Sequence, residues 1–193
     1  MSSSSDFYAA LSEALVDRCG PQHEALVTEL IALRARRGRL FVLGVGGGAA
    51  NAAHAVNDFR KLCGIEAYAP TDGIAELTAR TNDEGWPTVF TEWLRVSRIS
   101  FRDAIMVFSV GGGHPTVSAC IYEAIQLAYA VRAPVLGVVG RSDGAAAHQG
   151  NAVIVVGELS KSAWLTPITE TAQIAVLHAL VSDPRLRRSP TKW

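Results

Sequence analysis

Short apolar runs rich in β-branched residues recur along this chain, and helical patterns lie between most of them. The runs cover residues 40–45, 65–68, 104–109, 134–139 and 152–156. The helical patterns cover residues 49–63, 73–80, 87–96 and 116–131. A strand buried on both faces has this continuous apolar character, and alternation with helices is typical of parallel sheets. The sequence therefore predicts an α/β fold, a three-layer α-β-α sandwich around a five-stranded parallel sheet.

Two helical patterns precede the first predicted strand. One spans residues 7–16, with Ser5 and Asp6 as candidate N-caps, and the next begins at Pro21. A last helix is expected over 166–181. A chain of 193 residues fits one domain of ordinary size. We therefore predict a single domain over 1–193, made of N-terminal helices (1–38), an α/β core (39–182) and a basic tail (183–193).

Composition excludes several classes of function. Lys and Arg number 18, as do Asp and Glu, so a field strong enough to hold nucleic acid or an anionic membrane is not expected. The three cysteines lie too far apart for a disulfide framework or a cysteine zinc site, and neither a signal peptide nor a membrane-spanning run is visible. We therefore expect a cytoplasmic protein. Charged residues make up only 19%, which favours an oligomer.

Two glycine-rich turns follow predicted strands. They read Gly44-Val-Gly-Gly-Gly-Ala49 and Ser109-Val-Gly-Gly-Gly-His-Pro-Thr116. Glycine-dense backbone at a helix N-terminus lets several N–H groups converge on an anion. In a flavodoxin-like sheet of order 2-1-3-4-5, strands one and three are neighbours, so both turns open on one crevice at the carboxyl ends of the strands. We predict that this crevice binds the ligand; the alternative for the first turn is a tight turn that only brings its helix close to the sheet.

The first turn also matches a relaxed dinucleotide-binding fingerprint, Gly44-x-Gly46-x-x-Ala49. The acidic residue that should end the second strand is missing, because Tyr68-Ala-Pro70 occupies that place. Two helices ahead of the first strand are also unusual for that fold. We therefore favour other functions over a nicotinamide or flavin enzyme.

Two pairs of polar side chains could hold an ion. His54 and Asp58 are four residues apart, so they share one face of the helix that follows the first turn. Glu170 and His178 are eight apart in the last helix, again on roughly one side. Each pair taken alone is more typical of a helix-surface contact, and His178 is also compatible with a core histidine. No spacing rule shows that the two pairs meet.

Taken together, these features resemble the sugar isomerase (SIS) domain family, and within it the phosphoheptose isomerase group. The resemblance rests on the two glycine turns, on His54, on the Asn82-Asp83 pair and on His178 in the last helix. It extends from the N-terminal helices to Val181.

The resemblance implies a metal, usually zinc. In the family, a His and a Glu one turn apart in the first crossover helix and a Gln and a His in the last helix bind it. Those places fall on His54, Asp58, Glu170 and His178. Both histidines match, and the two substitutions, Asp58 and Glu170, retain oxygen ligands.

The phosphate-binding side departs further from the family, whose members place serine and threonine hydroxyls along both turns. Several of those positions are held here by Gly48, Val110, Gly111, Gly113 and His114. Backbone amides can still hold an anion, and His114 is either a replacement donor or an exposed loop histidine. The predicted substrate-binding residues are Gly46, Gly47, Gly48, Asn51, Asn82, Asp83, Ser109, Gly111, Gly112, Gly113, His114 and Thr116.

The resemblance implies a ketose–aldose isomerase that acts on sedoheptulose 7-phosphate or a related long-chain ketose phosphate through an enediol. Asp58 and His178 would be the acid/base pair, and the protein would be a homotetramer with sites between subunits. The alternative is a non-catalytic SIS protein that binds a sugar phosphate as a regulator or assembles with a protein partner. Loss of the loop hydroxyls favours this alternative, whereas four candidate ligands favour the enzyme.

Overall fold

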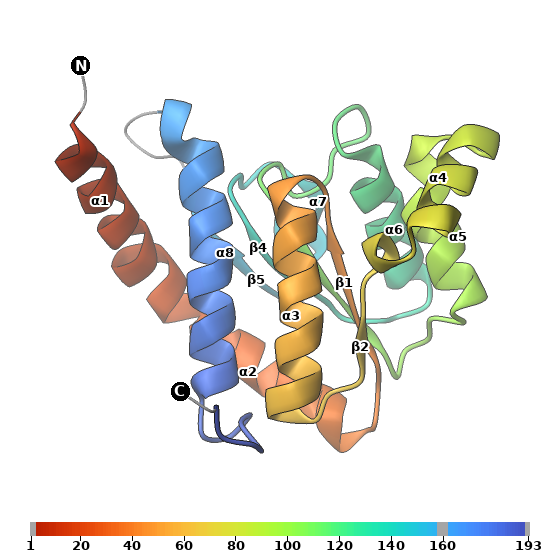
Figure 1. The fold of residues 1–193 in the computed structure, drawn as a ribbon, viewed down its shortest axis with the longest axis horizontal. Coiled ribbons are helices and arrows are strands. Elements are labelled where there is room, and N and C mark those ends of the chain that lie inside the picture. The colour runs from red at the N-terminus through yellow and green to blue at the C-terminus, as the bar shows by residue number, and fades with distance from the viewer. Residues whose placement is uncertain (1–2, 158–161, 192–193) are drawn as a thin grey trace.

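The sheet of this protein has five parallel strands. The computed structural model describes residues 3–157 and 162–191 (Figure 1). The strands are β1 Leu40–Gly44, β2 Ala67–Tyr68, β3 Ala104–Ser109, β4 Val135–Val139 and β5 Ala152–Val155. They pair in the order β2-β1-β3-β4-β5, and every neighbouring pair is parallel. The fold class and strand order predicted from the sequence are confirmed.

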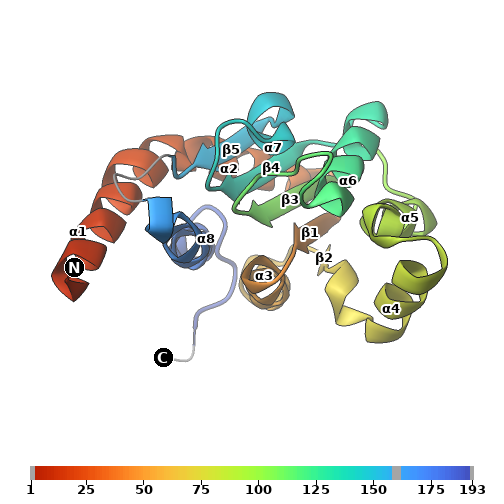
Figure 2. The same ribbon diagram turned by 90° about the horizontal axis from the view of Figure 1, so that it is seen from above.

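Helices cover both faces of the sheet (Figure 2). The first face is covered by α1 Ser4–Glu13, α2 Gly20–Ala35, α3 Gly47–Cys63 and α8 Leu165–Ser182. The other face carries α4 Ile74–Asp83, α5 Val89–Val96, α6 Ala119–Ala130 and α7 Ala145–Gln149. Side chains of β1 alternate between the two cores, with Leu40 and Val42 in the first and Phe41 and Leu43 in the second. This double burial explains why the strands are continuous apolar runs.

The N-terminal helices differ from the prediction in their boundaries. Ser3, rather than Ser5 or Asp6, is the N-cap of α1; Asp6 is the third helical residue and completes a capping box with Ser3. The chain does not leave the helical state before Pro21, because a π-helical segment, Ala14–Cys19, joins α1 to α2. A proline ring clashes with the carbonyl four residues earlier in a regular α-helix, and the wider π turn relieves that clash.

Two further elements differ from the sequence analysis. The helix α7 was not predicted, because five residues are too few to show a helical period. The β2 strand is two residues long, since it pairs with β1 only at Ala67 and Tyr68 before Pro70 begins a 3₁₀ turn. In the described part of the chain, no helix combines the length and apolar character that a bilayer span requires.

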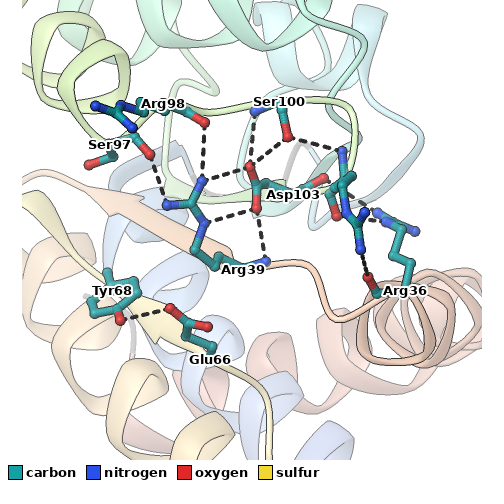
Figure 3. A network of polar contacts seen from close by, with 9 residues as sticks. Arg36, Arg39, Glu66, Tyr68, Ser97, Arg98, Ser100 and Asp103 are labelled. Carbon is teal, nitrogen blue, oxygen red and sulfur yellow. Dashed lines mark hydrogen bonds and ion pairs between the residues drawn. The ribbon is translucent and has the colours of Figure 1, made fainter.

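A polar network fixes the amino ends of β1 and β3 (Figure 3). The buried Asp103 carboxylate accepts hydrogen bonds from the backbone N–H of Arg39 and from its Nε and Nη2, each at 3.0 Å. The backbone N–H of Ser100 also donates to it, at 2.9 Å. Burial disfavours the charge on Asp103, but these hydrogen bonds outweigh it and lower the pKa of the carboxyl.

The C-terminal segment is bound to the helices beside it. The backbone N–H groups of Arg188 and Ser189 both donate to the carbonyl of Leu62, at 2.7 and 3.1 Å. The Arg34 guanidinium donates to the carbonyl of Leu186. Residues 192–193 of the predicted basic tail lie outside the described residues. The predicted domain bounds stay a prediction.

Candidate functional site

A crevice of about 360 Å³ lies between the two glycine-rich turns. It is there because β1 pairs with β3, with Gly44 opposite Phe108, so that both turns begin at neighbouring strand ends. Its lining residues are Val45, Gly48, Phe108, Ser109, Val110, Gly111, Val117, Ser118, Arg141, Leu165, Glu170 and Gln173. The structure thus brings residues of both turns together at the carboxyl ends of the strands, as the sequence analysis expected.

The first turn owes its glycines largely to backbone geometry. Gly46 has φ +61°, where residues with a side chain are strained. A Cβ added to Gly48 would lie only 2.4 Å from the carbonyl oxygen of Phe108. Gly48 is therefore a position of close contact between α3 and β3, and the structure leaves no room there for a hydroxyl-bearing side chain.

The carboxylate of Glu170 covers Gly47 at the start of α3. Its three carboxyl atoms lie 2.5–2.6 Å from where a Gly47 Cβ would stand. A carboxylate is favourable at the positive end of a helix. The backbone of α8 is held there by Asn51, whose Nδ2 donates to the Glu170 carbonyl at 3.0 Å and to Oε1 of Gln173 at 2.8 Å. Asn51, predicted to bind substrate, thus ties α3 to α8.

In the second turn, the glycines have different roles. Gly112 and Gly113 have φ +71° and +83°, and their carbonyls accept from the first N–H groups of α7. Ser109 is buried, and its Oγ accepts from the N–H of Gly112 at 3.0 Å. A Cβ added to Gly111, by contrast, would meet nothing within 4 Å. Gly111 is therefore the one residue of this glycine triplet with room for a side chain.

Of the predicted substrate-binding residues, Gly48, Ser109 and Gly111 are among the described residues that line the crevice, and the other nine are not. Two exposed pairs, one on the second turn and one on α4, are among those nine. His114 and Thr116 are exposed on the second turn, where His114 Nδ1 lies 3.0 Å from Thr116 Oγ1. Asn82 and Asp83 are exposed at the end of α4, which lies beyond β2 at the edge of the sheet (Figure 1). The Asn82 amide donates to the Asp83 carboxylate at 2.7 Å. The hydrogen bond between these two side chains lies away from the crevice.

A His-Asp-His cluster, made of His54, Asp58 and His178, lies where α3 packs beside α8 (Figure 1). His54 Nε2 lies 3.1 Å from Asp58 Oδ2 and 3.4 Å from His178 Nε2. One ligand atom from each of the three residues falls within 4.8 Å of the others. Four ligands at the usual Zn–N distance define a tetrahedron with edges of about 3.3 Å. The two short separations match that edge, so the cluster fits a divalent metal.

The cluster is open to solvent on one side. The Asp58 side chain is only 13% exposed, and its Oδ1 accepts from the Asn57 amide at 2.9 Å, whereas the His54 side chain is 44% exposed. A cavity of about 300 Å³ adjoins it, with Asp58, His178 and Thr191 in its lining. Catalytic zinc sites have this pattern, with three protein ligands and a fourth position open to water or substrate.

Glu170, the fourth predicted ligand, is not brought to this cluster. It precedes His178 by eight residues, which corresponds to about 12 Å along the helix axis. Its carboxylate is held at Gly47 instead.

No family model matches the chain. The phosphoheptose isomerase of Thiobacillus denitrificans is 27% identical over 172 residues, which span 85% of this chain and 80% of the relative. The lincomycin biosynthesis protein LmbN of Streptomyces lincolnensis is 30% identical over 71% of this chain, which spans about half of that longer protein (52%). The solved phosphoheptose isomerase of Neisseria gonorrhoeae superimposes with a TM-score of 0.73 over 92% of this chain and 91% of its own, at 23% identity.

The resemblance to the sugar isomerase domain family is confirmed. The chain is similar to phosphoheptose isomerase. The predicted zinc, homotetramer and cytoplasmic location stay predictions.

Arg141 and Gln173, two polar residues that line the crevice, were not predicted from the sequence. Arg141 is the second residue after β4, so its place at the carboxyl end of a strand next to β3 was a usable signal. Gln173 is fully buried, and its Nε2 donates to the carbonyl of Val138 at 3.2 Å. It lies one helical turn after Glu170, but its burial depends on α8 packing against the sheet, which sequence spacing does not reveal.

Proposed function

We propose that the protein is an aldose–ketose isomerase that acts on a sugar phosphate. Its similarity to a phosphoheptose isomerase supports this class of reaction. The observation that carries the proposal is the convergence of His54, Asp58 and His178 within 4.8 Å. Isomerisation needs a base, an acid and an electrophile at one place, and this cluster offers groups for all three.

The cluster fits a divalent metal, and imidazole with carboxylate suits zinc. His54 and Asp58 from α3 and His178 from α8 would hold it. A metal bound there would polarise the carbonyl of the substrate. Asn57 orients the Asp58 carboxylate by donating to its Oδ1, which leaves Oδ2 directed at His54.

Asp58 and His178 would move the protons of the reaction. In the ketose, a base takes a proton from C1, the C1–C2 double bond of the enediol forms, and the C2 carbonyl oxygen receives a proton from an acid. Return of a proton to C2, with loss of the C1 hydroxyl proton, gives the aldose. We assign these transfers to Asp58 and His178 as an acid/base pair, each acting through the side-chain atom that does not bind the metal.

The substrate we propose is sedoheptulose 7-phosphate or a related ketose phosphate of seven or eight carbons. The second turn has glycines where the family has hydroxyls, and each lost hydroxyl removes a hydrogen bond to the phosphate worth about 1.5–3 kcal/mol. This loss weakens the binding of sedoheptulose 7-phosphate and favours a related sugar. Turnover of sedoheptulose 7-phosphate is therefore expected to be slow.

A direct test is to incubate the protein, supplied in turn with zinc, manganese, cobalt, nickel and iron, with a panel of ketose phosphates in D₂O. Formation of the aldose and deuterium incorporation at C2, followed by NMR, would support the proposal. Asp58→Asn and His178→Gln should abolish both signals. His148→Gln is the matched control, since His148 is an exposed histidine on α7 outside the cluster.

A sugar-phosphate-binding regulator is the second candidate, favoured by one observation. Glu170 places a negative charge at the α3 N-terminus, where an anionic ligand of the first turn would otherwise lie. If no sugar phosphate in the panel is isomerised while one of them binds, the isomerase proposal is wrong and the regulator is the better description.

A further inference from the structure

The crevice has charged groups of opposite sign in its lining. Among its described lining residues, Glu170 is the one acidic side chain and Arg141 the one basic side chain. Glu170 is a residue of α8, but its carboxylate lies at the first glycine turn, where it covers Gly47. An anion at that turn would meet a like charge, so the anionic end of a ligand is favoured on the Arg141 side.

Backbone hydrogen bonds hold Arg141 beside the second glycine turn. The N–H groups of Gly140 and Arg141 both donate to the carbonyl of Val110, at 2.9 Å. Gly144 packs so closely on this turn that an added Cβ would lie 2.1 Å from the carbonyl oxygen of Gly111. These contacts fix the start of the Arg141 side chain next to Gly111, the position with room for a ligand.

The side chain of Arg141 is oriented by Asp143. Arg141 Nε donates to Asp143 Oδ1 at 2.8 Å, and its Nη2 donates to Oδ2. This pairing lowers the pKa of Asp143 to about 2, so both groups are charged at neutral pH. The Arg141 side chain is 54% exposed, which leaves it accessible to a ligand in the crevice.

We infer that Arg141 binds the anionic group of the substrate at the second glycine turn and replaces the hydroxyls that this turn lacks. Asp143 takes the Nε and Nη2 donors on one side of the guanidinium, and the donors of Nη1 and Nη2 on its outer end form a second pair whose spacing matches phosphate oxygens. The Glu170 carboxylate, at the other side of the crevice, then accepts a hydrogen bond from a hydroxyl of the sugar. The inference rests on the proposed function only in taking a sugar phosphate as the substrate.

The experiment measures binding of inorganic phosphate to the full-length protein by calorimetry. Arg141→Gln is expected to weaken phosphate binding by about tenfold to a hundredfold. Arg141→Lys should retain part of the affinity, because it keeps the charge and loses the fork. Arg95→Gln is the matched control: Arg95 is an exposed arginine paired with Glu92 on α5, and its loss should leave the phosphate affinity within about twofold of the unmodified protein.

Activity on the sugar phosphate that the panel identifies separates this inference from the proposed function. We expect Arg141→Gln to raise KM with little change in kcat, as for a group that binds substrate and transition state equally. Phosphate affinity unchanged by Arg141→Gln, or no phosphate binding by the unmodified protein, would overturn the inference even if isomerisation is found. Loss of phosphate binding in Arg141→Gln upholds it, even if no sugar is isomerised and the proposed function fails.

Discussion

The Nε2 atoms of His54 and His178 lie 3.4 Å apart, although 124 positions separate the two residues in the sequence. Their rings meet edge to face, with centroids 5.1 Å apart. Parallel packing of α3 against α8 produces this contact, and Asp58 joins it from the next turn of α3. Two imidazole nitrogens and a carboxylate oxygen that face one another form a set of donor atoms that could hold a divalent ion.

We predict one equivalent of divalent metal per chain, with zinc the best ligand match. Elemental analysis of protein purified without chelator and then supplied with zinc measures it. His54→Gln should reduce the metal content well below one equivalent, because it removes the ligand atom nearest to both others. His148→Gln should not change it. Sub-stoichiometric metal in the unmodified protein after supply of zinc, manganese, cobalt, nickel and iron would contradict the prediction.

Glu170→Gln and Asp58→Asn should separate the crevice from the cluster. Because the Glu170 carboxylate lies at Gly47, its neutralisation should leave the metal content unchanged and should strengthen phosphate binding by removing a like charge. Asp58→Asn should lower the metal content. Equal loss of metal in both variants would show that Glu170 moves to the cluster when the ion binds, as the family resemblance implies.

Serine substitutions should improve substrate binding in the second glycine turn and destabilise the fold in the first. Gly111→Ser adds a hydroxyl where there is space, and one new hydrogen bond to a phosphate, worth about 1.5–3 kcal/mol, should lower the KM for sedoheptulose 7-phosphate by tenfold or more. Gly48→Ser should destabilise the fold by about 1–3 kcal/mol, because its Cβ would press on the Phe108 carbonyl. Steady-state kinetics and denaturant unfolding measure the two effects. A stable Gly48→Ser variant with improved KM would disprove this distinction.

The Asp103 carboxylate should stabilise the fold in a pH-dependent way. Removal of its charge in Asp103→Asn should cost about 3 kcal/mol in the free energy of unfolding, because Arg39 then loses a buried partner. The pKa of Asp103 is lowered in the folded state, so this stabilisation is present above the unfolded pKa of about 3.9 and is lost as the pH falls through the folded value.

Urea unfolding of both proteins between pH 7 and pH 3 tests this pH dependence. The difference in the free energy of unfolding between the unmodified protein and Asp103→Asn should shrink below about pH 4. Glu92→Gln, which removes the half-buried partner of the exposed Arg95, is the control and should change stability by less than about 0.5 kcal/mol at any of these pH values. A difference that grows on acidification would contradict the assignment.

The sequence alone predicted the layers, because the three central strands β1, β3 and β4 are buried on both faces and their apolar runs are therefore visible in the primary structure. The strand order was predicted by taking the sheet to be flavodoxin-like. The prediction missed α7 and misplaced the N-cap of α1. A five-residue helix shows no period, and neighbouring serines cannot be told apart as caps until the structure shows that the Ser3 hydroxyl accepts from the N–H of Asp6.

For the candidate site, sequence spacing could predict which residues come together only when they lie in the same helix or turn. The pairing of His54 with Asp58 follows from a separation of four residues in a helix, and glycine density marked both turns. The meeting of His54 with His178, the placement of Glu170 over Gly47 and the exposure of Arg141 to the crevice depend on how α3, α8 and β4 pack. Helical periodicity fixes which residues share a face, but tertiary packing decides which faces meet and at what height along their axes.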